Sequence, residues 1–179
     1  RVLETYPEKK VMYVSSEQFV NELINSIREQ RNEEFRSKYR TIDVLIVDDI
    51  QFIAGKTSSE EEFFHTFNSL FLANKQIIIS SDRPPKELHT LEERLRTRFE
   101  SGLLVDIQPP DFETRAAILK QKAEQFHLDI DYELITYIAS NINSNVRELE
   151  GTIKKITALT GFSKRPVTLE IVETALADF

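Results

Sequence analysis

The sequence contains the run Val44-Leu45-Ile46-Val47-Asp48-Asp49, which indicates the fold class. Its four apolar residues follow one another without polar alternation, which is typical of a strand buried on both faces in a parallel sheet. Ligands in such sheets bind outside the carboxyl ends of the strands, where Asp48 and Asp49 lie. The motif predicts a Walker B element, in which Asp48 holds Mg²⁺ and Asp49 orients the hydrolytic water. The alternative is a strand that ends in an ordinary Asx turn.

Other apolar runs match this strand pattern, and helical segments separate them. We expect further strands at residues 11–14, 76–81 and 103–107. The helix after the first of these strands carries its apolar residues on one expected core face: Phe19, Val20, Leu23, Ile24 and Ile27. Strands that alternate with helices are typical of a doubly wound parallel sheet. The first part of the chain is therefore predicted to be an α/β domain.

The character of the sequence changes at Pro109-Pro110, because proline cannot continue a strand and restricts the residue before it. Only helical patterns follow this pair. We therefore expect a domain boundary there, with an α/β core over residues 1–109 and a small all-α domain over residues 110–179.

The composition excludes several classes of protein. The 179 residues contain no cysteine, which rules out disulfides and thiolate metal sites in this chain. A net charge of −7 means that any contact with nucleic acid must come from a local patch. No apolar run is long enough to span a membrane and no signal-peptide pattern is present, which fits a cytoplasmic protein.

Four motifs in this order resemble the AAA+ ATPase domain of the DnaA family of bacterial chromosomal replication initiators. They are Asp48-Asp49-Ile50-Gln51-Phe52, Ser80-Ser81-Asp82, residues 93–99 and residues 144–151. The resemblance extends from about Val11 to the end of the chain. It implies a parallel-sheet AAA+ core of the P-loop NTPase type, followed by a small all-α lid.

The resemblance also implies which residues serve the nucleotide of the same subunit. Asp48, Asp49 and Asp82 would be catalytic, with Asp48 as the Mg²⁺ ligand. Ser81 and Asp82 match sensor I, although Ser and Asp before proline are also turn signals. Arg147 matches sensor II, and its place in the first turn of a helix, where a cation is disfavoured, is consistent with another role. The alternative for Arg147 is a structural salt bridge.

Two further pairs of residues match contacts to other molecules in this family. Arg98 matches the arginine finger, with Arg94 on the same helix face, and would contact the nucleotide of a neighbouring subunit. We expect Arg98 to be exposed, and a solvated basic face is the alternative. Ile24 and Lys56 match contacts to single-stranded DNA. From the residues alone, Ile24 is expected in the core and Lys56 as an ordinary surface lysine.

The chain departs from the family pattern in two places. It contains no G-x-x-x-x-G-K-[ST] motif, so the P-loop and its strand, which the family places before Arg1, are missing from the sequence. The C-terminal helix-turn-helix domain that would bind duplex DNA is also missing. We therefore expect a fragment that binds ATP weakly and does not hydrolyse it, whereas the full-length protein is expected to be a weak ATPase.

The expected function is that of an ATP-switched module of a replication initiator. ATP or ADP with Mg²⁺ would be the cofactors, and origin DNA and further copies of the protein in an oligomer or filament would be partners. Replication regulators or helicase machinery are expected as additional partners. The alternatives are a AAA+ helicase loader, an initiator regulator and an ATPase motor with steady turnover.

Overall fold

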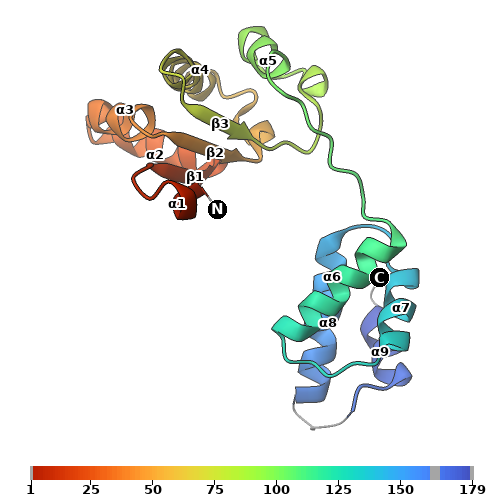
Figure 1. Cartoon of the computed structure of the whole chain (residues 1–179). Helices are drawn as coiled ribbons and strands as arrows, with labels where there is room; N and C mark the ends of the chain where they lie inside the picture. Colours follow the sequence, from red (N-terminus) through yellow and green to blue (C-terminus); the bar gives the residue numbers. More distant parts are fainter. Residues whose placement is uncertain (1, 162–165, 178–179) are drawn as a thin grey trace. The chain divides into compact units, whose positions relative to one another are not determined.

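The computed structural model describes residues 2–161 and 166–177, and the chain divides into two compact units, Arg1–Leu104 and Val105–Phe179 (Figure 1). The Pro109-Pro110 pair lies near the beginning of the second unit.

The first unit is built on a parallel sheet in the strand order β1-β2-β3. The strands are β1 (Val11–Ser15), β2 (Val44–Asp48) and β3 (Gln76–Ile79). The central strand β2 is paired along both edges, and its apolar side chains Val44, Leu45 and Val47 are buried. The predicted parallel sheet is therefore confirmed for these three strands.

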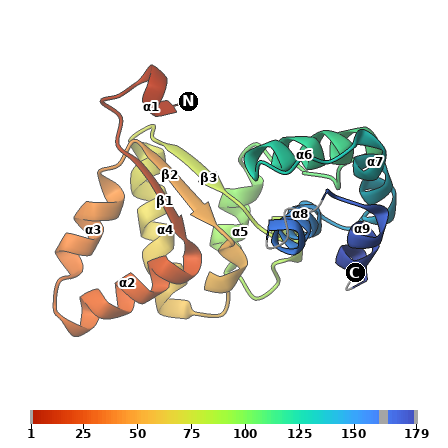
Figure 2. The same ribbon diagram turned by 90° about the horizontal axis from the view of Figure 1, so that it is seen from below.

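Three helices cover one face of the sheet: α2 (Ser16–Arg28), α3 (Asn32–Arg40) and α4 (Thr57–Leu72) (Figure 2). Their aromatic side chains form edge-to-face contacts around Phe19, whose ring centroid lies 4.9–5.4 Å from three other rings. The remaining helical segments of this unit are α1 (Val2–Thr5), η1 (Ile50–Ile53), η2 (Pro85–Glu87) and α5 (Glu93–Glu100).

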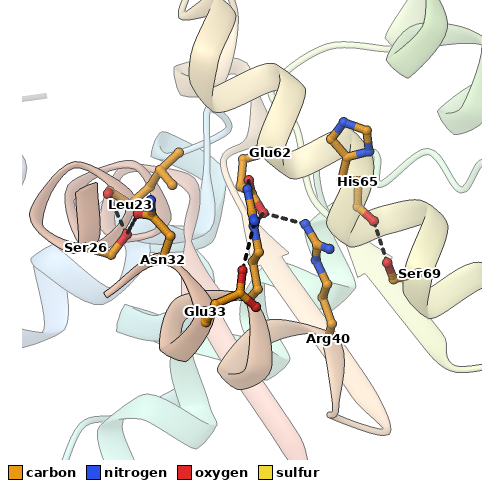
Figure 3. Close-up of polar contacts among 9 residues, drawn as sticks. Leu23, Ser26, Asn32, Glu33, Arg40, Glu62, His65 and Ser69 are labelled. Carbon is orange, nitrogen blue, oxygen red and sulfur yellow. Dashed lines mark hydrogen bonds and ion pairs between the residues drawn. The ribbon is translucent and has the colours of Figure 1, made fainter. Parts of the chain in front are cut away.

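An ion-pair cluster fixes α3 onto α4 (Figure 3). Glu62 of α4 is buried, and its carboxylate accepts from Arg40 at 2.5 Å and from Arg36 at 3.3 Å. Arg36 also donates to Glu33 at 3.1 Å. A buried carboxylate needs such partners, because desolvation of an unpaired charge is costly.

The expected strand at residues 103–107 is wrong. The structure gives this segment no regular secondary structure, and Leu103 and Ile107 are 92% and 90% exposed. The apolar pattern alone does not make a strand, because each backbone amide and carbonyl also needs a partner on a neighbouring strand. Here the segment does not pair with β3, and β3 is the edge of the three-stranded sheet.

The second unit contains only helices among its described residues, as expected after Pro110. They are α6 (Phe112–Gln125), α7 (Tyr132–Asn141), α8 (Val146–Gly161) and α9 (Leu169–Leu176). The helices enclose a separate apolar core whose fully buried members include Leu119, Ile138, Leu149, Ile153, Ile156 and Val172. Across the described residues, no helix is both long and apolar enough to cross a membrane.

Candidate functional site

Asp48 is the last residue of β2, and side chains on both sides hold its carboxylate. The Tyr13 hydroxyl, from β1, donates to Oδ2 at 2.6 Å. The Ser80 hydroxyl, from the residue after β3, donates to Oδ1. Because each oxygen accepts a hydrogen bond from a different neighbour, the carboxylate is fixed in one orientation at the carboxyl end of the sheet.

Asp49 turns the chain away from the strand. Its φ of 57° lies in the left-handed region, which aspartate tolerates better than most residues. The backbone N–H of Asp49 donates to the Ser80 hydroxyl at 3.0 Å, and its carbonyl accepts from the Ser16 hydroxyl at 2.5 Å. Its side chain accepts from Gln51 at 3.1 Å. The two carboxylates therefore leave the strand in different directions, each with its own set of contacts.

Tyr13 and Ser80 complete this site, and the sequence did not assign a role to either. The hydrogen bond to Asp48 raises the pKa of the Tyr13 phenol, with further contributions from desolvation and from the charges of Asp48 and Asp49. The phenol therefore remains a hydrogen-bond donor. The register between β1 and β2 could have identified Tyr13. It pairs Ser15 with Asp48, and Tyr13, two residues before Ser15, lies on the same face of the sheet as Asp48.

The residues predicted as sensor I lie one and two positions beyond Ser80. Asp82 is exposed and forms a bidentate pair with Arg83, at 3.0 and 2.8 Å, and this pairing lowers the pKa of Asp82. The Ser81 hydroxyl accepts from the Arg83 N–H at 3.4 Å. Of the two serine hydroxyls, that of Ser80 contacts Asp48, and the roles of Ser81 and Asp82 stay predictions.

The donor set at Asp48 fits Mg²⁺. This ion is usually held by one or two carboxylates together with water and phosphate oxygens. The oriented carboxylate of Asp48, with the Ser80 hydroxyl beside it, provides hard oxygen atoms at the expected place. Within residues 2–161 and 166–177 there is no cluster of three or more potential metal ligands, so a site enclosed by protein ligands alone is absent from these residues.

Helix α5 presents Arg94 and Arg98 on its exposed side, whereas Leu95 and Phe99 are buried. The Arg94 guanidinium carbon lies 4.5 Å from the centroid of the Phe64 ring, and Arg94 is also paired with Glu92. The Arg98 guanidinium carbon lies 5.6 Å from the centroid of the Phe71 ring. The exposure expected for Arg98 is therefore present, and its role as a finger stays a prediction.

Arg147 lies in the first turn of α8 and is exposed. The Asn145 side chain accepts from the Glu148 N–H at 2.9 Å and so caps this helix, while the Ser144 hydroxyl donates to the Glu148 carboxylate. Arg147 has no carboxylate partner among the described residues, so the structural salt bridge considered as its alternative is absent there. Its role as sensor II stays a prediction.

The expectation that Ile24 lies in the core is wrong, because Ile24 is 40% exposed. The buried face of α2 is narrower than the apolar pattern suggested: Val20 is its last buried residue on this side, about 40° from Ile24 around the helix, and Ile27 is 51% exposed as well. Lys56 is exposed directly before α4. Both residues are therefore accessible, as contacts to a single strand would require.

Comparisons with known proteins show the family to which the chain belongs. The family model described as the bacterial DnaA ATPase domain matches residues 1–106. The chromosomal replication initiator protein DnaA of Caldanaerobacter subterraneus subsp. tengcongensis is 62% identical over 169 residues, which are 94% of this chain and 38% of that protein. The chain thus spans well under half the length of this relative.

Solved structures are similar over most of the chain. Domain III of the Thermotoga maritima replication initiation protein DnaA is 40% identical, with a TM-score of 0.96, over 99% of this chain and 75% of that one. A replication initiator DnaA bound to AMPPCP and single-stranded DNA is 41% identical, with a TM-score of 0.78, over 89% of this chain and 49% of that one. This chain therefore belongs to the family of bacterial DnaA ATPase domains.

Proposed function

We propose that this chain is the ATP-responsive module of a bacterial chromosomal replication initiator, acting in the cytoplasm. The observation that carries the proposal is the carboxylate of Asp48, oriented by Tyr13 and Ser80 at the carboxyl end of a parallel sheet in a chain of this family. The relative that was solved with AMPPCP and single-stranded DNA supports the same two classes of ligand here.

In this proposal each residue at the sheet end has one task. Asp48 holds Mg²⁺, which supplies neutralising charge at the phosphates, and Asp49 orients the attacking water. Ser81 and Asp82 contact the γ-phosphate side, and Arg147 reaches the nucleotide of its own subunit. Hydrolysis is slow and serves to turn the module off.

Arg98 serves the nucleotide of a neighbouring copy, with Arg94 beside it. A guanidinium that is exposed and carries no carboxylate partner within the described residues can offer its N–H donors to a phosphate outside the subunit. ATP thereby favours a homo-oligomer or filament, and regulators or helicase machinery act on that assembly.

Ile24 and Lys56 contact single-stranded origin DNA in this assembly. The lysine neutralises a phosphate, and the exposed isoleucine offers an apolar surface to a sugar or base. Two such contacts per copy are weak in isolation, so strong binding requires the repetition of copies along the strand.

The test measures binding of a fluorescent single strand to the full-length natural protein, with ATP and with ADP, over a series of salt concentrations. We expect tighter binding with ATP. Lys56→Ala should lower the salt slope by about 0.7, the value for one phosphate contact on a single strand. Lys120→Ala, at an exposed lysine of the helical unit, is the matched control. Equal binding with ATP and ADP would contradict the proposal.

A further inference from the structure

Helix α5 is attached to α4 through the residue next to Arg98. Phe99 is buried, and its ring centroid lies 6.3 Å from that of Phe63 and 5.9 Å from that of Phe67. Both partners belong to α4. The backbone at Arg98 is therefore held in place by the aromatic core, while the Arg98 side chain leaves the helix about 100° away from that of Phe99.

Another aromatic ring of α4, that of Phe71, lies under that side chain. The rings of Phe67 and Phe71 are nearly parallel, with an interplanar angle of 12° and centroids 6.1 Å apart. Phe67 is buried, whereas Phe71 is 51% exposed. The Arg98 guanidinium carbon lies 5.6 Å from the centroid of Phe71, within the range of a cation–π contact. Phe67, Phe71 and Arg98 thus form a stack that begins in the core and ends at the surface.

We propose that Phe71 is a positioning residue for Arg98 and orients it for an anionic group presented by another copy of the protein. This inference rests on the proposed function, in which that group is the nucleotide polyphosphate of the neighbour. An exposed arginine has many accessible rotamers, and a flat ring that is itself fixed by Phe67 reduces their number.

The chemistry of the ring explains why it suits this task. A carboxylate could also orient the guanidinium, but it would neutralise the charge that the neighbouring phosphate needs. The face of an aromatic ring attracts the cation and leaves its N–H donors available at the edge. Within the described residues Arg98 has no carboxylate partner.

Arg94 provides an internal comparison one turn earlier on the same helix. It also lies over a ring, that of Phe64 at 4.5 Å, but it is additionally paired with Glu92. Phe64 is less exposed than Phe71. The Arg94 guanidinium therefore shares its donors with a carboxylate of its own subunit, whereas the described residues give Arg98 no such carboxylate.

The first measurement follows the Arg98 side chain by NMR in this chain. Protons held over the face of a ring are shielded, so the Arg98 Hδ signals should lie upfield of those of an exposed arginine such as Arg28. Phe71→Leu should remove this shift, and Phe71→Tyr should preserve it. Unshifted Arg98 signals in the unmodified chain would overturn the inference, whatever the effect of the variants on assembly.

The second measurement is the ATP-dependent self-association of the full-length natural protein, by analytical ultracentrifugation. Phe71→Leu should weaken it about 2- to 5-fold per interface, as expected for an exposed cation–π contact. Phe71→Tyr should restore it, and Leu72→Ala, at the exposed neighbour, should have no effect. In an Arg98→Ala background, Phe71→Leu should cause no additional loss, because the ring acts through the arginine.

The outcomes separate this inference from the function on which it rests. If Arg98→Ala leaves association unchanged, the proposed role of Arg98 is wrong. If Arg98→Ala abolishes association while Phe71→Leu matches the unmodified protein, only the role of Phe71 is wrong. An additive loss in the double variant would also contradict it, since Phe71 would then contact the neighbour directly.

Discussion

The hydroxyl group of Tyr13 donates a 2.6 Å hydrogen bond to Oδ2 of Asp48, between the neighbouring strands β1 and β2. The register pairs Tyr13 with Ile46, so Asp48 lies two residues further along and on the same face of the sheet. The length of the tyrosine side chain spans this offset. Together with Ser80, it holds the carboxylate that the proposed function assigns to Mg²⁺.

Loss of the Tyr13 hydroxyl should weaken the response to Mg²⁺. We expect Tyr13→Phe to reduce Mg²⁺ affinity in the presence of ATP by about tenfold. Loss of a side chain that hydrogen-bonds to a metal-binding residue typically lowers metal affinity about 10- to 100-fold. The measurement is a Mg²⁺ titration of ATP binding by the full-length natural protein. Tyr132→Phe, at an exposed tyrosine of α7, is the control. An unchanged Mg²⁺ midpoint in Tyr13→Phe would show that this hydrogen bond does not tune the site.

Disruption of the ion-pair cluster at Glu62 should lower the free energy of unfolding. Glu62→Gln removes the anion that Arg40 contacts and leaves Arg36 with Glu33, and the Glu62 side chain is only 11% exposed. We expect a decrease of about 2 kcal/mol in the free energy of unfolding, less than the 3–5 kcal/mol of a fully buried pair because both arginines are partly solvated. Urea denaturation measures it. Glu61→Gln, at the exposed neighbouring residue, should be nearly neutral.

The contacts of Asp43 should make the stability of the fold depend on pH. The Lys75 ammonium group, at 2.6 Å, and the Lys10 N–H, at 2.9 Å, lower the pKa of Asp43 from 3.8 to about 2. A lowered folded-state pKa stabilises the fold above the unfolded-state value, and this contribution is lost as the pH falls from about 4 to 2.

The matching experiment compares unfolding of the unmodified chain and of Asp43→Asn across that range. The unmodified chain should be the more stable one at pH 5, and the difference should shrink steadily toward pH 2. A difference that stays constant from pH 5 to pH 2 would show that the pKa of Asp43 is not lowered in the folded state.

Deletion of a core ring should destabilise the first unit more than any of these changes. Phe63 is fully buried and its ring meets those of Phe19, at 5.4 Å, and Phe99. Phe63→Ala should cost about 3–5 kcal/mol, the usual value for a buried phenylalanine. Chemical denaturation checks this value, and His65→Ala, at an exposed position of the same helix, is the control. A cost below 1 kcal/mol would contradict the packing described for this core.

The sequence predicted the parts of the fold that depend on local pattern. An unbroken apolar run identified β2, and the two carboxylates at its end marked the edge of the sheet where the site lies. The helices after Pro110 followed from their spacing of apolar residues. Each of these elements can be recognised from residues that are close together in the sequence.

The errors concern relationships between distant residues. The segment 103–107 has the composition of a strand but no pairing partner in the structure, and Ile24 lies just beyond the buried face of its helix. Asp48 accepts hydrogen bonds from Ser80, not Ser81, and from Tyr13. Both contacts depend on the register between the strands. No local pattern records that register.

In the proposed function, Arg98 of one copy acts on a nucleotide at Asp48 of another copy, where Asp49 orients the attacking water. The most direct measurement mixes two full-length natural variants, Arg98→Ala and Asp49→Asn, and follows ATP hydrolysis. Each variant alone should be inactive. In an equimolar mixture, about one interface in four joins an intact Arg98 to an intact Asp49, so hydrolysis should return to about a quarter of the unmodified rate. A mixture as inactive as its components would show that Arg98 does not act on the nucleotide of a neighbouring copy.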